Sequence, residues 1–477
     1  MPHLHDPSLA KIFAQDREIL KHTSIPIVTV AGTFAEDVKD WHGKKNENIS
    51  TDIVFSRAHF SMAYAALQTI WKDTPDQKKA WLVDPTNFVS AKDWRGVQMT
   101  EDVGQLIARS PLLKTVKDII DRFGRKKMPI LGSITPPLLY LFEEVQQPIL
   151  SFHIAAGNIL ASMGKTVVQV VTDPHVRDEY LEHANLPNLH YCVFDEETKF
   201  EALEKTFMNG MHLDPDRVIV TGPPIDQRII NLRKQKTTLN NSHPLRLLIT
   251  TGGLGTNKGE IRDILDQLLP SLHTPNPQFE LMLYAGTQKD FMEMGKELGK
   301  QHNVLIKTIS DFNTEIPYRH APHGRLAVRD DKDDLKSVSS LSTPEHNHLT
   351  KQPGNQLTIL YHPQIFDANE ILIKYGFPWA DGVITKPSGD MAYDAAAAGC
   401  FLLTLKPWGV WEERIEDIFW QKGIARKAET KQIEKQLKTL SDIGWLKSAM
   451  EAARDIDPLY LGGIEKIVEV IQALHLR

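Results

Sequence analysis

The stretch LRLLITTGGLGTNK, residues 245–258, indicates the fold that the rest of the chain is expected to follow. Leu245–Thr250 is a nearly continuous apolar run, which is typical of a parallel strand that is covered on both faces. A loop with three glycines follows it and leads into a helical pattern over residues 258–269. A strand, a glycine-rich loop and a helix in this order predict one βα unit of a Rossmann-like sheet.

The same alternation of short β-branched runs and longer helical patterns recurs on both sides of this stretch. It predicts parallel strands at residues 27–31, 51–55, 80–83, 166–171, 190–194, 217–220, 279–285, 304–308, 357–361, 382–385 and 401–405. Residues 148–163 are predicted as one helix. A chain of 477 residues also exceeds what one hydrophobic core usually supports, so we expect two α/β domains.

The domain boundaries follow from shifts in composition. Residues 222–244 open with Gly-Pro-Pro and continue as a basic, polar stretch, which is typical of a linker. We therefore expect two Rossmann-like domains that face each other across a cleft. The predicted segments are an N-terminal domain over 1–222, a linker over 223–244, a C-terminal domain over 245–455 with a long polar insertion at 318–355, and a helix over 456–477 that packs back on the N-terminal domain.

Composition and charge exclude several classes of protein. With 41% apolar and 24% charged residues the chain is an ordinary globular protein, and a net charge of -6 argues against general nucleic-acid binding. Cys192 and Cys400 are predicted as buried thiols. No uncharged apolar run reaches about 18 residues, so we expect a cytoplasmic protein, free or attached to a membrane face. Residues 112–127 form a basic amphipathic pattern, either a membrane-surface helix or an ordinary core-facing one.

The loop after residue 250 is a candidate phosphate site, because open parallel sheets bind ligands beyond the carboxyl ends of their strands. Glycines let the backbone approach a phosphate, and a helix start adds N–H donors and partial positive charge. The candidate residues are Gly252, Gly253, Gly255, Thr256 and Lys258. A tight turn that binds nothing is the alternative interpretation.

A second candidate lies in GVITKPSGDMAYDAAAAG, residues 382–399. Asp394, one turn inside the predicted helix, can accept both hydroxyls of a ribose. In the alternative interpretation Asp390 complements the helix dipole and Asp394 is solvated. The other candidate residues of this loop are Lys386, Ser388, Gly389 and Asp390.

His59 is the candidate general base. It stands in FSRAHFS, residues 55–61, between the predicted strand at 51–55 and a helix. Imidazole titrates close to neutral pH and can take a proton from a hydroxyl. A surface or helix-capping histidine is the alternative interpretation.

Together these loops resemble those of GT-B-fold glycosyltransferases, in particular the group that holds the lipid-linked peptidoglycan transferases and the monogalactosyl- and glucosyl-diacylglycerol synthases. The likeness spans about residues 165–425 and is carried by residues 171–173, 195–226 and 251–255, and by 383–389 with Asp394 and Gly399 at the family's spacing.

The chain also departs from this pattern. Asp394 stands where the family usually has Glu, and Ser56, Arg57 and Ala58 stand where glycines precede the histidine.

The resemblance implies a hexosyltransferase-type glycosyltransferase that moves a sugar from a nucleoside diphosphate-sugar, with a UDP-sugar favoured, to a hydroxyl of a lipid or small-molecule acceptor. It implies no metal and no cofactor. It assigns the candidate residues of both loops and Glu412 to binding of the donor, with Asp394 binding the ribose. It assigns His59 the role of base or positioning group, and it places Arg57 and Asp173 on the acceptor side of the site. A nucleotide-sugar 2-epimerase and a non-catalytic nucleotide- or sugar-binding protein are the alternatives, and the altered residues 56–58 favour the latter.

Overall fold

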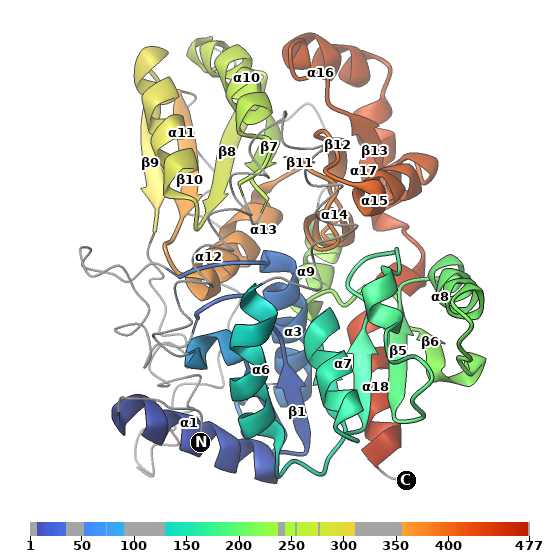
Figure 1. The fold of residues 1–477 in the computed structure, drawn as a ribbon. Helices are drawn as coiled ribbons and strands as arrows, with labels where there is room; N and C mark the ends of the chain where they lie inside the picture. The colour runs from blue at the N-terminus through green and yellow to red at the C-terminus, as the bar shows by residue number, and fades with distance from the viewer. Residues whose placement is uncertain are drawn as a thin grey trace.

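The computed structural model of the protein describes residues 7–34, 52–72, 74–89, 129–236, 244–252, 255–274, 277–310 and 355–475. These residues form two α/β domains, each built on its own parallel sheet (Figure 1). This arrangement confirms the predicted fold of two Rossmann-like domains of GT-B type. The predicted basic helix at 112–127 and all but Asn355 of the predicted insertion at 318–355 lie outside the described residues.

The first sheet has the strand order β2-β1-β3-β4-β5-β6, and every neighbouring pair is parallel. Every residue of β1, β3 and β4 is buried, which explains why these strands are mostly apolar. The strands are β1 (Ile25–Val28), β2 (Ala80–Val83), β3 (Ile149–Ser151), β4 (Val167–Val170), β5 (Leu189–Val193) and β6 (Val218–Val220). The helices around them are α1 (Pro7–His22), α3 (Arg57–Trp71), α6 (Pro129–Phe142), α7 (Ile154–Ser162) and α8 (Glu196–Met208).

Two predictions in this domain are wrong. The described part of residues 51–55 makes only an isolated antiparallel bridge, between Val54 and Gly32. Its backbone bonds to residues beyond the end of β1 and to the other domain: the Phe55 amide donates to the carbonyl of Ala31 at 2.8 Å, and the Asp52 amide donates to the carbonyl of Pro363 at 3.0 Å. Residues 148–163 contain strand β3 before helix α7. The prediction of a single helix failed because a short buried strand and a buried helix are both apolar, and periodicity does not distinguish them.

The second sheet has the order β13-β12-β11-β7-β8-β10-β9 and is also parallel throughout. Its strands are β7 (Leu245–Thr250), β8 (Phe279–Gly286), β9 (Leu305–Ile309), β10 (Gln356–Tyr361), β11 (Gly382–Thr385), β12 (Phe401–Thr404) and β13 (Ala425–Lys427). Its helices are α10 (Lys258–Leu268), α11 (Lys289–Gln301), α12 (Ile365–Ile371), α13 (Phe377–Trp379), α14 (Met391–Ala397), α15 (Val410–Gln421), α16 (Ile433–Asp442) and α17 (Trp445–Arg454).

The chain crosses between the domains twice. Helix α9 (Gln227–Leu232) follows the first crossing, and after α17 the chain returns to the first domain, where α18 (Gly463–His475) packs on α3 and β4 (Figure 1). Gly222 lies where the two crossings touch: its φ is +93°, and a Cβ there would come within 2.0 Å of the Leu459 carbonyl oxygen. Glycine is therefore required at this point of the linker.

Cys192 and Cys400 are buried and unpaired, as predicted. Among the helices that the structure describes, not one is long and apolar enough to cross a bilayer.

Candidate functional site between the domains

The order of the second sheet brings the two predicted loops together. The chain runs outward from β7 to β8 in one direction and from β11 to β12 in the other, so the loops after β7 and β11 emerge side by side at the point of reversal. The hydroxyls of Thr250 and Thr385, at the ends of these strands, are hydrogen-bonded at 2.7 Å. A Cβ on Gly252 would lie 2.6 Å from Cε of Lys386. These contacts place Gly252 and Lys386 at one site.

The first sheet reverses its order between β1 and β3, and it contributes a second group of side chains. Helix α3 begins at Arg57 with Ser56 as its N-cap, so His59 lies in the first turn. His153, the N-cap residue of α7, packs edge-on against His59 with 5.4 Å between ring centroids. Asp173 follows β4. His153 was missed from the sequence because it stood inside the single helix predicted over 148–163.

The two groups meet across the domain interface at Gly389. A Cβ on this residue would lie 2.5 Å from the Thr172 carbonyl oxygen and 2.6 Å from Oδ1 of Asp173. Only glycine allows the loop after β11 to come this close to the end of β4. The acceptor-side and donor-side residues predicted from the sequence are therefore neighbours in the structure.

Arg57 makes a buried polar contact between the domains. Its guanidinium donates to Oδ2 of Asp390 and, at 3.0 Å, to Oδ1 of Asn369, and it lies 3.7 Å from Oδ2 of Asp394. The side chain is 7% exposed. Burial disfavours its charge, but Asp390 and Tyr284 outweigh that effect and the pKa of Arg57 is raised. Burial alone would raise the pKa of Asp390, but the charge of Arg57 contributes to a net lowering of this pKa.

Asp394 is buried beside this pair. Its pKa is raised to about 8 by burial, with Arg57 opposing the rise and the neighbouring Asp390 and Asp226 adding to it. The interpretation of Asp394 as a solvated side chain is wrong, because the residue is 5% exposed. A neutral carboxyl at this position is a hydrogen-bond donor as well as an acceptor.

His59 is half-buried and held neutral. Burial and the charge of Arg177 together lower its pKa to about 4, although a hydrogen bond to the Val30 backbone and the charge of Asp390 act in the opposite direction. Its Nδ1 has no hydrogen-bond partner. A neutral imidazole with one free nitrogen is the form that accepts a proton. Arg177, like His153, carried no signal in the sequence.

Three further candidates form a chain of charges next to Gly389. Lys386 pairs with Glu412 at 2.5 Å, and the second carboxylate oxygen of Glu412 accepts the Trp408 amide at 2.7 Å. Burial raises the pKa of Asp173 to about 6, with Arg177 opposing the rise and Glu412 adding to it. This effect of Glu412 is a further sign that the first-domain aspartate and the second-domain donor residues share one site.

The remaining candidates of the glycine loop differ in what the structure shows. Gly253 lies outside the described residues. Thr256 is buried and its hydroxyl has no partner, so it is a polar group oriented for a ligand. Lys258 is engaged by Asp290 at 2.7 Å near the surface. Its predicted contact with a phosphate requires this pair to break.

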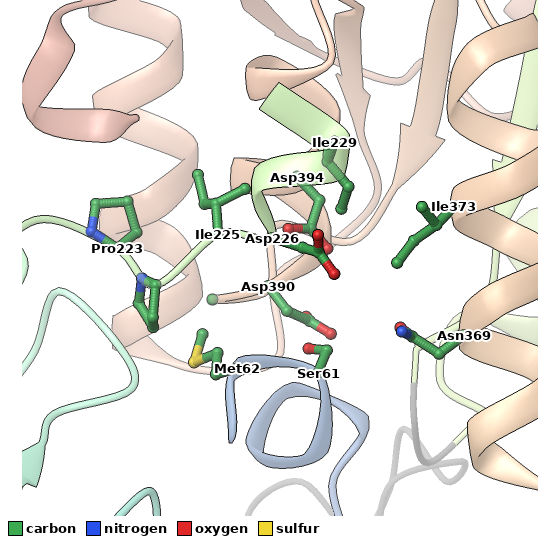
Figure 2. Close-up of a pocket in the computed structure, with 12 residues that line it drawn as sticks. Ser61, Met62, Pro223, Ile225, Asp226, Ile229, Asn369, Ile373, Asp390 and Asp394 are labelled. Atoms are coloured by element: carbon green, nitrogen blue, oxygen red, sulfur yellow. The ribbon is translucent and has the colours of Figure 1, made fainter. Parts of the chain in front are cut away.

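The space between the loops is closed in this structure. One cavity of about 10 Å³ is lined by residues of both domains, with Ser61, Asp226, Asn369, Asp390 and Asp394 around it (Figure 2). A second cavity of about 20 Å³ lies beside Gly252 and Tyr284. Each has room for about one water molecule, far below the few hundred Å³ of a small-molecule pocket.

Within the described ranges, no three His, Cys, Asp or Glu side chains converge as metal ligands would. The metal independence implied by the resemblance stays a prediction.

Comparison of the chain with known proteins found similarity only to solved structures. No protein-family model and no curated protein matches the chain. Among the similar structures, Acinetobacter baumannii MurG has 12% identity and a TM-score of 0.44 over 94% of this chain and 99% of that chain. UDP-GlcNAc 2-epimerase from Neisseria meningitidis bound to UDP-GlcNAc has 14% identity and a TM-score of 0.46 over 94% of this chain and 100% of that chain. The glycosyltransferase SnogD from Streptomyces nogalater has 11% identity and a TM-score of 0.41 over 94% of this chain and 99% of that chain. Since these TM-scores lie below 0.5, the likenesses carry no argument about chemistry.

Proposed function

We propose that the protein is a metal-independent glycosyltransferase that moves a sugar from a nucleoside diphosphate-sugar, with a UDP-sugar favoured, to an acceptor hydroxyl. The observation that carries this proposal is the meeting of two switch points. The reversal in the second sheet puts Gly252 and Lys386 at one place. The first turn of α3 contains His59 and meets the loop after β11 through the contact of Arg57 with Asp390. Crevices at such reversals are where open α/β sheets bind nucleotides.

The donor half of the reaction rests on the second domain. Asp394 holds the ribose hydroxyls, and the backbone amides at the start of α10 and around Gly389 face the diphosphate. The bond between the anomeric carbon and the phosphate oxygen breaks, and its electron pair goes to the leaving diphosphate. Amide donors that are already in place stabilise the charge that grows there. The unpartnered hydroxyl of Thr256 is a further donor for the same group.

The acceptor half rests on the first domain. The acceptor oxygen bonds to the anomeric carbon while its proton passes to the free Nδ1 of His59. Since the pKa of His59 is lowered to about 4, the base is in its accepting form across the neutral range. Activity that depends on this base is therefore expected to be flat between about pH 6 and 8 and to fall in acid.

The first experiment screens nucleotide sugars by thermal shift, and then measures donor hydrolysis and transfer with the wild type, His59→Ala and the exposed-histidine control His212→Ala. We expect loss of at least about a hundredfold in rate for His59→Ala, the usual share of general base catalysis, and an unchanged rate for His212→Ala. Equal rates in all three proteins exclude His59 as the base.

A second experiment separates the proposal from its competitors. Incubation with UDP-N-acetylglucosamine alone tests for 2-epimerisation, because an epimerase turns its substrate over without an acceptor. Calorimetry of Asp394→Ala with UDP, GDP and ADP tests the ribose contact. Unchanged affinity for all three nucleotides removes Asp394 from the donor site.

The acceptor class rests on the resemblance alone. A lipid acceptor and a peripheral membrane contact predict that the protein floats with vesicles of anionic lipid. Absence of flotation together with transfer to a small-molecule hydroxyl assigns the acceptor to the second class.

A further inference from the structure

We propose that Arg57 is a plug in the nucleotide pocket, a side chain of the first domain that fills the pocket in the closed protein and must leave before a nucleotide binds. The inference rests on the proposed function for the identity of the ligand. Arg57 stands where the resembling enzymes have glycine, so the plug belongs to this chain rather than to the family pattern.

The position of the guanidinium carries the argument. Arg57 itself lines the cavity of about 20 Å³, together with Thr251, Gly252 and Tyr284. Its partners Asp390, Asn369 and Asp394 line the cavity of about 10 Å³ (Figure 2). Arg57 therefore lines one void and its hydrogen-bond and ion-pair partners line the other, so the guanidinium stands between the glycine loop and Asp394.

The contacts of Arg57 are also the contacts that the ligand needs. Asp394 is the ribose residue of the proposed site, and Gly389, next to Asp390, is where the diphosphate has to pass. One polar atom of the plug is unsatisfied, because the buried Nε of Arg57 has no hydrogen-bond partner. A buried polar atom without a partner weakens the closed state relative to one in which the side chain is solvated.

The place of Arg57 in the fold provides a route out of the pocket. The residue opens α3 in the first domain, and the linker residues 223–226 line the smaller cavity between the domains. A hinge motion in this linker separates the two sheets and withdraws Arg57 together with its helix. Entry of the nucleotide is then coupled to domain opening, and closing over the ligand requires the guanidinium to stay outside the space that the diphosphate occupies.

The test measures UDP affinity by calorimetry for the wild type, Arg57→Ala and Arg414→Ala. Arg414 pairs across the same domain interface with Asp195, Glu197 and Glu201 but lines neither cavity. Its ion pairs are partly exposed, so their loss weakens closure only slightly and leaves Arg57 in the pocket. We expect Arg57→Ala to bind UDP about tenfold tighter or more, because a plugged state populated at about 90% lowers apparent affinity by that factor. Arg414→Ala is expected within about twofold of the wild type.

Removal of Arg57 leaves Asp390 buried without its cation, which destabilises a protein. The double variant Arg57→Ala/Asp390→Asn removes both charges and is expected to bind UDP more tightly than the single variant Asp390→Asn, which keeps the plug. Weaker or unchanged UDP binding in both variants overturns the proposal and makes Arg57 a phosphate ligand or a bystander. An equal gain in Arg414→Ala overturns it too, since domain opening alone then explains the effect.

Failure of the proposed function has a different result. If none of these proteins binds UDP, ADP or GDP, the proposal of a nucleotide site is wrong. The crystal structure of the Arg57→Ala variant then tests separately whether Arg57 fills a pocket. A single cavity joining Gly252 to Asp394 supports it. Side chains that collapse into the vacated space overturn it.

Discussion

Replacement of Asp394 by Asn is expected to change how the free energy of unfolding depends on pH. Asp394 is 5% exposed, and burial raises its pKa to about 8 although Arg57 opposes the rise. The folded protein therefore keeps a proton on this carboxyl between about pH 5 and 7, where an unfolded aspartic acid has lost it. A raised pKa of the folded state contributes stability that is present in acid and is lost as the pH rises through about 8.

The size of the effect follows from one proton. A difference of one bound proton changes the free energy of unfolding by about 1.4 kcal/mol per pH unit, or about 3 kcal/mol between pH 5 and 7. Asn has the shape of the protonated acid and does not titrate. The stability of the wild type relative to Asp394→Asn should thus fall by about this amount over the interval, as measured by urea denaturation at constant ionic strength.

The matched control for this experiment is Asp442→Asn, at an exposed carboxylate on α16. Its profile is expected to run parallel to that of the wild type. If the Asp394→Asn profile also runs parallel to the wild type from pH 5 to 8, then Asp394 is ionised in the folded protein. The account of its burial beside Arg57 is in that case incorrect.

Three further substitutions test the packing around the site, each by chemical denaturation. Tyr393→Phe is expected to raise the free energy of unfolding by about 1 kcal/mol, because the buried hydroxyl has no partner; a loss of stability would reveal one. Gly389→Ala should cost about 1–3 kcal/mol, since its Cβ would lie 2.5 Å from the Thr172 carbonyl oxygen, whereas Gly259→Ala, with no atom within 4 Å, should cost nothing. Ser56→Ala should cost about 1 kcal/mol through loss of the α3 N-cap and Ser56→Asp should not, so equal losses in both contradict the cap.

Several strands of the second domain were predicted well because their signals are local. Leu245–Thr250 is an apolar run bounded by Pro244 and a glycine loop, and the observed strand β7 has the predicted bounds. Strand β11 likewise has the predicted bounds, 382–385. A run of apolar residues and the residues that end it are neighbours in the chain, so the sequence contains the whole signal.

The failures occurred where local signals are ambiguous. Strand β3 was absorbed into a predicted helix because Ile149–Ser151 and α7 are both buried and apolar. Residues 51–55 were predicted as a strand because they are rich in β-branched and apolar residues, but their backbone bonds to residues 31–33, beyond the end of β1, and forms only an isolated bridge. Which run joins a sheet depends on the partners available to it, and those are set by the tertiary structure.

The sequence by itself determined the two-domain α/β class and the two loops that carry the candidate donor residues, since glycines, capping residues and strand ends act within a few positions of one another. Only the tertiary structure decided that the loops after β7 and β11 are neighbours, that His153 and Arg177 surround His59, and that Arg57 reaches Asp390 across 333 residues of chain. The physical reason is that strand order and domain closure are chosen by the burial of surfaces far apart in the chain. No periodicity along the sequence records which of those surfaces meet.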